Sequence, residues 1–343
     1  MRAISCGGAD GGRRPRFHRS VVDRRVARDA RCTLRAKRTA PQRWRKLNGH
    51  RLSSRRQVGH HDCRVVTSAP SGGETAVAAL AVCCDSVQPL ANARAEALAI
   101  RLGVPRIDCA SRGYPLLLVV TAERLELRQT DNTDGPVYSE FATGRFGYRR
   151  TLPLAQELLA RAIGFKGVPL DVIDATAGLG RDAMVLLLLG CRVTAIESHP
   201  VVVELFEDGL RRARSHPELA DAIDDRLRLI HDDAVAYLGS LPSGTAPDVI
   251  YLDPMFPART QSALMKKELR LLGRLTGSGG DDGDRGADAL LRAALTTGCH
   301  RIVVKRPRRS SDLLLTGGTP PAASFEGRGA RFDVYIPAGA GEV

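Results

Sequence analysis

The sequence has no apolar run long enough to cross a membrane. Its longest apolar runs, such as residues 183–190 ("AMVLLLLG"), are far shorter than the roughly 20 residues that a bilayer requires. The arginines near the N-terminus are not followed by an apolar segment of the signal-peptide type. We therefore expect a cytoplasmic protein with no membrane partner.

Cysteines at metal-binding spacing are also missing. None of the eight cysteines forms a CxxC pair, and Cys83 and Cys84 are adjacent. The sequence therefore predicts free thiols and no metal site. Cys191 and Cys299 border predicted strands, where a cysteine is more often a small core residue than a nucleophile.

The net charge of +13 is unevenly distributed along the chain. The first 70 residues hold 19 lysines and arginines against 4 acidic residues, whereas the remainder holds 32 against 34. Residues 1–72 also lack the periodicity of a helix or a strand, so we expect a basic, disordered extension. It would be either an RNA-binding arm or an extension translated from a start codon placed too far upstream.

Residues 76–147 have the pattern of a small α/β subdomain. Strands are expected at 76–84, at 114–129 (two strands around a turn) and at 136–144, and a helix at 91–104. Residues 144–154 ("GRFGYRRTLPL") are expected to be a loop that leads into the rest of the chain.

Residues 148–343 alternate regularly between apolar strands and amphipathic helices. Strands are expected at 170–175, 191–197, 226–233, 248–253 and 300–306, and helices at 154–164, 181–190, 200–214, 234–240, 261–275 and 287–298. This alternation predicts a Rossmann-like α/β fold with a mostly parallel, doubly wound sheet. A last strand at 331–337 is expected to be antiparallel at one edge, and residues 276–288 to be a flexible loop.

A glycine-rich loop, "DATAGLGRD" (174–182), follows the first strand of this alternating region. Ligands of doubly wound sheets bind outside the carboxyl ends of the strands, where glycines let the backbone approach them closely. Gly178 and Gly180 provide this, but Ala183 stands where a dinucleotide fingerprint has its third glycine. Asp174 would repel a phosphate and suits a cationic ligand.

Acidic residues also end the next strands. Glu197 lies 19 residues after Gly178, where a carboxylate can bind both hydroxyls of a ribose. Asp233 ends the third strand, where a plain helix N-cap is the alternative interpretation. Acids at successive strand ends without a phosphate-binding motif favour S-adenosylmethionine over NAD, and the pattern resembles Rossmann-like methyltransferases.

The fourth strand ends in "DVIYLDPMFP" (248–257). An acid or amide, a proline, another residue and an aromatic residue are typical there of methyltransferases that act on exocyclic amino groups. Asp253 and the carbonyl of Pro254 can accept hydrogen bonds from such a group, and Phe256 can stack on an extruded base. Met255 departs from the common second proline, and we find no chemical role for it beyond packing.

Together, "DATAGLGRDA", "GCRVTAIE", "RLRLIHDDA", "VIYLDPMFP", "RIVVKRP" and "RFDVYI" resemble the bacterial ribosomal RNA small-subunit methyltransferase J family, from about residue 80 to 340. The resemblance implies an S-adenosylmethionine-dependent enzyme that methylates guanine N2 in 16S ribosomal RNA, alone or in the small subunit. The resemblance implies cofactor contacts at Arg181, Asp182, Glu197, Ser198, Asp233, Ala234 and Asp253. Gly178 of the glycine-rich loop is a further candidate cofactor contact. At Asp233 the backbone amide is the expected contact, and a monomer is expected.

Basic residues near this edge of the sheet are candidates for contacts with RNA phosphates. They are Arg149, Arg150, Lys266, Lys267, Lys305, Arg306, Arg308 and Arg309. Three other functions remain open at this point. They are an adenine-N6 or protein-amine methyltransferase, a non-catalytic RNA-binding protein and, more remotely, a nicotinamide oxidoreductase.

Overall fold

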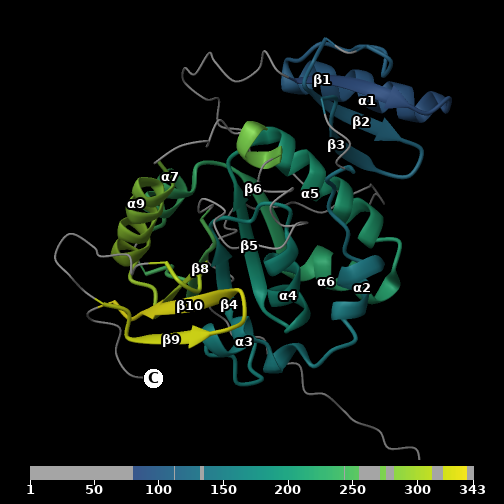
Figure 1. Cartoon of the computed structure of the whole chain (residues 1–343). Helices are drawn as coiled ribbons and strands as arrows, with labels where there is room; N and C mark the ends of the chain where they lie inside the picture. Colours follow the sequence, from purple (N-terminus) through teal and green to yellow (C-terminus); the bar gives the residue numbers. More distant parts are fainter. Residues whose placement is uncertain are drawn as a thin grey trace, which may run out of the picture. The chain divides into compact units, whose positions relative to one another are not determined.

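The computed structural model describes residues 80–337, except for 112, 132–134, 243, 255–270, 276–281 and 311–319 (Figure 1). The predictions for residues 1–72, for Met255 and Phe256, and for Lys266 and Lys267 lie outside the described residues.

The larger sheet of the described residues has seven strands, in the order β6-β5-β4-β7-β8-β10-β9. Its strands are β4 (Asp171–Asp174), β5 (Arg192–Glu197), β6 (Leu227–His231), β7 (Val249–Leu252), β8 (Arg301–Pro307), β9 (Ala323–Glu326) and β10 (Ala330–Tyr335). Strands β4 to β8 are parallel, whereas β10 runs antiparallel to both β8 and β9. The strand order reverses between the parallel neighbours β4 and β7, because β5 and β6 lie on one side of β4 and β7 lies on the other. The carboxyl ends of β4 and β7 border the crevice where such sheets bind ligands.

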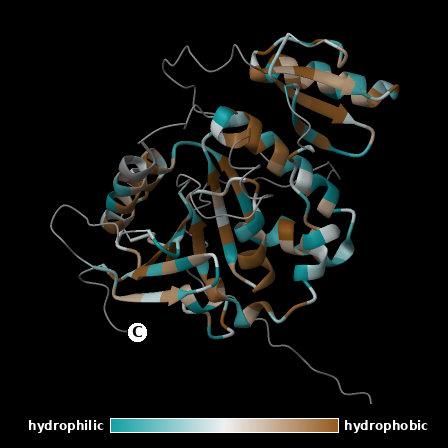
Figure 2. Cartoon of the chain, in the orientation of Figure 1, coloured by the Kyte–Doolittle hydropathy of each residue, from teal (hydrophilic) through white to brown (hydrophobic). Residues whose placement is uncertain are grey.

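Helices cover both faces of the large sheet. Side chains along each strand point alternately to the two faces, and an apolar cluster lies on each face. Val249 and Tyr251 of β7 belong to one cluster, and Ile250 and Leu252 to the other. Figure 2 shows mostly hydrophobic colours along the central strands. The first cluster includes α3 (Leu158–Ala162), α4 (Arg181–Leu188), α5 (Pro200–Ala213) and α6 (Pro217–Arg226), and the second α7 (Ala234–Gly239) and α9 (Asp282–Thr296). The mostly parallel, doubly wound α/β fold is thus confirmed.

A separate three-stranded sheet precedes the large one. Its strands β1 (Leu80–Asp85), β2 (Leu116–Thr121) and β3 (Leu125–Gln129) pair in that order, β1 parallel and β3 antiparallel to β2. Helix α1 (Pro89–Leu102) packs against it and ends at Gly103, whose left-handed backbone (φ 64°) lets its amide reach the last carbonyls of the helix.

Buried polar contacts join the small sheet to α5. The Asp208 carboxylate, which is 1% exposed, accepts a hydrogen bond of 3.0 Å from the backbone amide of Leu125. Three arginines also bind this carboxylate, namely Arg94 of α1 and Arg211 and Arg212 of α5. One carboxylate therefore links α1, β3 and α5.

The segment that follows β3 touches the glycine-rich loop. The hydroxyl of Ser139 donates a hydrogen bond of 3.0 Å to the carbonyl of Leu179. Phe141, fully buried two residues later, packs edge-on against Phe206 of α5 with ring centroids 5.6 Å apart. The segment after the small sheet is thus in direct contact with the first loop of the large sheet and with α5.

Several sequence-based boundaries were wrong. Residues 136–144 form no strand but a single bridge between Val137 and Leu127, and the expected loop at 144–154 contains α2 (Gly144–Arg149). The expected helix at 154–164 is divided into a 3₁₀ turn, η3 (Leu154–Gln156), and α3. The second half of the expected loop at 276–288 is helical because α9 begins at Asp282. Helix α6 and strand β9 were not predicted, and β9 rather than β10 forms the sheet edge.

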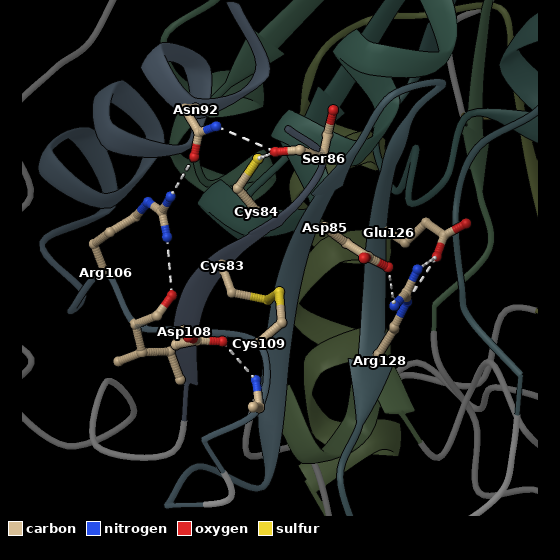
Figure 3. Close-up of a disulfide and its surroundings, with 12 residues drawn as sticks. Cys83, Cys84, Asp85, Ser86, Asn92, Arg106, Asp108, Cys109, Glu126 and Arg128 are labelled. Atoms are coloured by element: carbon tan, nitrogen blue, oxygen red, sulfur yellow. Dashed lines mark hydrogen bonds and ion pairs between the residues drawn. A yellow bond between two sulfur atoms is a disulfide. The ribbon is translucent and has the colours of Figure 1, made fainter. Parts of the chain in front are cut away.

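The expectation of free thiols fails for one pair of cysteines. Cys83 in β1 is disulfide-bonded to Cys109, with 5.2 Å between their Cα atoms (Figure 3). The chain after α1 runs alongside β1, where Val82 donates to the carbonyl of Pro105 and accepts from the amide of Ile107. This pairing brings together cysteines that are 26 residues apart, which their spacing alone does not reveal. Cys191 and Cys299 are buried free cysteines, as expected.

The described residues contain neither a membrane-spanning helix nor a metal-binding cluster. No helix in this part of the chain is long and apolar enough to cross a bilayer. Likewise, these residues contain no group of three or more histidine, cysteine, aspartate or glutamate side chains placed to hold a metal ion.

Candidate active site

The glycine-rich loop joins β4 to α4 by a left-handed turn. Gly178 and Gly180 have φ angles of 53° and 79°, which side-chain-bearing residues rarely adopt. A Cβ atom at Gly180 would also lie 2.2 Å from the ring of Phe206, whereas one at Gly178 would meet only the carbonyl of Thr176 at 3.9 Å. Gly180 is thus required by packing, and Gly178 leaves open space beside the backbone.

Glu197, at the end of β5, fixes the position of this loop. Its Oε2 accepts a hydrogen bond of 3.0 Å from the amide of Gly178, and its Oε1 one of 2.8 Å from the amide of His199. Burial raises the pKa of Glu197 despite these two donors. Each carboxylate oxygen has a second lone pair, so the side chain can still accept from a ligand.

A lysine from β8 joins two carboxylates at the carboxyl edge of the sheet. Nζ of Lys305 lies 2.8 Å from Oδ2 of Asp182, at the start of α4, and 2.7 Å from Oδ2 of Asp253, after β7. The hydroxyl of Tyr251 donates to the same Asp182 oxygen at 2.7 Å, and the amide of Asp253 donates to the hydroxyl of Thr176 at 2.5 Å. These bonds link β4, α4, β7 and β8 at the carboxyl edge of the sheet.

The charges of this cluster shift one another's pKa values. Although burial opposes the effect, Lys305 and the Tyr251 hydroxyl lower the pKa of Asp182 to about 2, and the two carboxylates raise the pKa of Lys305. Burial raises the pKa of Asp253, with Asp182 adding to this and Lys305 opposing it. Burial and the other carboxylates raise the pKa of Asp174 well above its ordinary value. One ammonium therefore stands among three carboxylates.

A hollow of about 320 Å³ opens beside this cluster. Asp182 and Lys305 line it, together with Arg149, Glu157 and Phe332. Arg149 is bound to Glu157 through two hydrogen bonds and lies 3.8 Å from Oδ1 of Asp182. The hollow therefore combines paired charges with an apolar wall.

Comparisons with known proteins agree with this geometry. A family described as "Putative SAM-dependent methyltransferase" matches residues 106–337. The ribosomal RNA small subunit methyltransferase J of Nitrosococcus oceani is 46% identical over 256 residues, which cover 74% of this chain and 96% of that protein. The chain belongs to the ribosomal RNA small subunit methyltransferase J family.

Further relatives of this methyltransferase support the same placement. The J enzyme of Thioalkalivibrio sulfidiphilus is 44% identical over 246 residues, covering 71% of this chain and 92% of that protein. Among solved structures, the SAM-dependent methyltransferase NGO1261 from Neisseria gonorrhoeae is similar with a TM-score of 0.57 and 32% identity, covering 76% of this chain and 97% of that one. S-adenosylmethionine is therefore the cofactor of this methyltransferase.

The residues at the carboxyl edge fit this cofactor. S-adenosylmethionine carries a cationic sulfonium and an amino group and has no phosphate, and when bound it supplies an electrophilic methyl group. Asp174, Asp182 and Asp253 with the single ammonium of Lys305 form a site that favours a cation and disfavours a phosphate. The open space beside Gly178 lets a ligand approach the backbone.

The structure brings together some of the expected cofactor residues but places others differently. Gly178, Asp182, Glu197 and Asp253 meet at the carboxyl edge. The Asp233 carboxylate accepts from the amide of Ala236 at 2.8 Å, so it is an N-cap of α7, the alternative interpretation.

The other residues expected in the site lie at the ends of strands and helices. The amide of Asp233 donates to Oδ1 of the neighbouring Asp232, and a cofactor contact at this amide stays a prediction. Ala234 opens α7, and Arg181 is exposed at the start of α4. The carbonyl of Ser198 lies 3.1 Å from Nε2 of His231. Pro254 follows Asp253 and is half-buried.

Most of the described basic residues expected to meet RNA phosphates are engaged within the fold. Arg149 binds Glu157, Arg150 binds Glu218, and Lys305 binds Asp182 and Asp253. Arg306 is 2% exposed and bonds to Ser310, while Arg308 is exposed and lies 3.4 Å from Glu326. Arg309 is exposed. The expectation was therefore wrong for Lys305 and Arg306, whose contacts lie inside the protein.

Sequence reasoning missed Tyr251, Thr176 and the position of Lys305. A tyrosine in a fully buried strand needs a hydrogen-bond partner for its hydroxyl, and this signal pointed to a polar group such as Asp182. Thr176 and Lys305 carried no comparable signal, because a threonine in a loop and a lysine near a strand end are common.

Proposed function

We propose that this methyltransferase transfers the methyl group of S-adenosylmethionine to the exocyclic N2 of a guanine in 16S ribosomal RNA, either naked or within the small ribosomal subunit. The observation that carries the proposal is the position of Asp253. It follows β7 at the crevice, its Oδ2 is bound by Lys305, and it directly precedes Pro254. The names of the curated relatives, with which the chain shares more than 40% identity, support the ribosomal RNA substrate.

The chemistry of an aromatic amine explains the need for an acceptor there. The lone pair of such a nitrogen is delocalised into the base, so it is a weak nucleophile until hydrogen-bond acceptors hold its N–H groups. The Asp253 carboxylate and the Pro254 carbonyl are suited to accept these hydrogen bonds, and Phe256, outside the described residues, is the proposed stacking partner of the base. Asp253, Pro254 and Phe256 are therefore the proposed catalytic residues.

The proposed cofactor contacts are divided between two parts of the site. Glu197, which also anchors Gly178, is the proposed ribose partner, and Arg181 and Asp182, at the start of α4, are further proposed cofactor contacts. Backbone groups of Ser198 and Ala234 complete the set, while Asp233 acts chiefly as a helix cap. A cytoplasmic location, a monomeric state and the domain boundaries at 72, 76 and 147 remain predictions.

Methylation of ribosomal RNA by the full chain tests the proposal. Purified protein with methyl-labelled S-adenosylmethionine is expected to label small-subunit RNA or particles, and nucleoside analysis should identify N2-methylguanosine. Asp253→Ala should lower labelling by at least about 100-fold, as expected for a group acting mainly in the transition state. Binding of S-adenosylhomocysteine should largely survive in this variant.

The exposed Asp225 of α6 provides a matched control, since Asp225→Ala should leave labelling unchanged. Labelled N6-methyladenosine or labelled protein would replace the proposal with one of its alternatives. Absence of cofactor binding in calorimetry would favour a non-catalytic RNA-binding protein. Labelling that persists in Asp253→Ala would remove Asp253 from the catalytic residues.

A further inference from the structure

Lys305 lies at the centre of the site, although methyl transfer does not by itself require a lysine there. Its ammonium is shared between Oδ2 of Asp182 and Oδ2 of Asp253, at 2.8 and 2.7 Å, and its side chain is 26% exposed. Lys305 pairs in register with Phe332 of β10, so its other side faces an apolar residue. The ammonium therefore depends on the two carboxylates for its charged partners.

We infer that Lys305 is a positioning residue that keeps Asp253 ionised and turned so that its second oxygen accepts the N–H of the substrate amine. This inference rests on the proposed function, because it assigns Lys305 a task within the same acceptor site.

The orientation of Asp253 supports the first part of this role. Within the described residues, the contact to its carboxylate falls on Oδ2, while its backbone amide is held by the hydroxyl of Thr176. The side chain is thus fixed at one oxygen and at the backbone, and no other described residue binds Oδ1, which we infer accepts from the substrate. A carboxylate held at two points loses less conformational entropy when the substrate binds.

The surrounding charges support the second part. Among the residues that the structure describes, the titratable groups that face Asp253 and Lys305 are Asp174 from β4, Asp182 from α4 and Tyr251 from β7. Arg149 of α2 lies near Asp182, but its guanidinium is already bound to Glu157. In the part of the chain that the structure describes, Lys305 is therefore the cation in direct contact with both Asp182 and Asp253.

Removal of this cation would leave the two carboxylates facing each other in a half-buried site. Two such groups do not both remain ionised near neutral pH, and one takes up a proton. Tyr251 still donates to Asp182, so Asp253 is the carboxylate that protonates. A protonated Asp253 donates a hydrogen bond at the oxygen that bears the proton, and its power to accept from the substrate amine falls.

The pH dependence of methylation distinguishes this role from a merely structural one. In Lys305→Met we expect the acid limb of the kcat profile to move up by at least about one pH unit, so that kcat falls roughly tenfold at each pH below the limb and is recovered above it. KM for the RNA should change little. Lys305→Arg, which keeps the charge, should restore the acid limb to its wild-type position.

Lys166 is a matched control because it is an exposed lysine between α3 and β4, and Lys166→Met should show the wild-type profile. If Lys305→Met does not fold, Lys305→Gln keeps a hydrogen-bond donor without the charge, and the same upward shift is expected. An unshifted acid limb, or activity lost equally at every pH in a folded variant, would overturn the inference. A wild-type enzyme that does not form N2-methylguanosine would instead overturn the proposed function.

Discussion

The backbone amide of Gly178 donates a hydrogen bond of 3.0 Å to Oε2 of Glu197. Because Gly178 lies in the loop after β4 and Glu197 ends β5, this bond joins the carboxyl ends of two neighbouring parallel strands. The same carboxylate accepts from His199, at the start of α5. The side chain proposed to bind the ribose thus also shapes the loop that is proposed to hold the cofactor.

Glu197→Gln should therefore weaken cofactor binding. An amide nitrogen cannot accept a hydrogen bond, so either Gly178 or His199 loses its acceptor. We expect the Kd for S-adenosylhomocysteine to rise roughly 10- to 100-fold, the equivalent of one hydrogen bond to a charged group. Calorimetry measures it, and Glu96→Gln on the exposed face of α1 serves as the control. An unchanged Kd would separate Glu197 from the cofactor site.

Gly180→Ala should destabilise the protein by about 2 to 4 kcal/mol. The residue has a φ of 79°, and a Cβ atom would lie 2.2 Å from the Phe206 ring, so backbone strain adds to overpacking. Gly286→Ala, in α9 with no atom within 4 Å of the new methyl group, should instead stabilise by about 0.5 to 1 kcal/mol. Urea unfolding of both variants tests this contrast, and equal effects would contradict it.

Asp208 should contribute to stability in a pH-dependent way. The Leu125 amide and the surrounding arginines hold the pKa of this carboxyl below its ordinary value, although burial opposes them. Because the folded-state pKa is lowered, the stabilisation is full above the unfolded-state pKa of about 4 and is lost as the pH falls through the folded-state value.

We expect Asp208→Asn to lower the free energy of unfolding by about 3 kcal/mol at pH 7, and the difference from wild type to shrink below about pH 4. Denaturant unfolding between pH 3 and 7 measures it. Asp225→Asn, at an exposed position of α6, provides the baseline. A difference that stays constant across this range would show that the charge of Asp208 is not what stabilises the junction.

The bond between Cys83 and Cys109 should stabilise the oxidised protein. It closes a loop of 26 residues, for which chain entropy predicts about 3 kcal/mol. A reductant should lower the unfolding midpoint of the oxidised wild type and leave that of Cys83→Ala unchanged. Peptide mapping of the untreated protein should recover the two cysteines in one cross-linked product, and free thiols at both positions would contradict the pairing.

Much of the large sheet could be predicted because its strands are buried on both faces and therefore form continuous apolar runs. Val249 to Leu252 are an example, since adjacent side chains enter opposite clusters. Helix α2 was missed because Gly144 and Gly147 disfavour a helix. Burial of Phe146 against Phe141, with ring centroids 5.7 Å apart, outweighs that propensity.

The residues of the site likewise include some that could be predicted from the sequence and some that could not. Acids at strand ends are visible in the sequence, since the alternation of strands and helices brings the ends of parallel strands to one edge. The role of Lys305 was not visible, because its partners Asp182 and Asp253 are 123 and 52 residues away in the chain. Only the register of β8 beside β7 brings these groups together.

The hydrogen bond from Ser139 to Leu179 bears on how this protein can be recombined with its relatives. A crossover at residue 148, between the two expected domains, would give the glycine-rich loop a foreign Ser139 and would give Phe206 of α5 a foreign Phe141. The Asp208 carboxylate would likewise have to accept a foreign β3. Chimeras that exchange the small sheet should therefore fold only when α5 and the glycine-rich loop come from the same parent as the small sheet. The two sheets should thus be exchanged together.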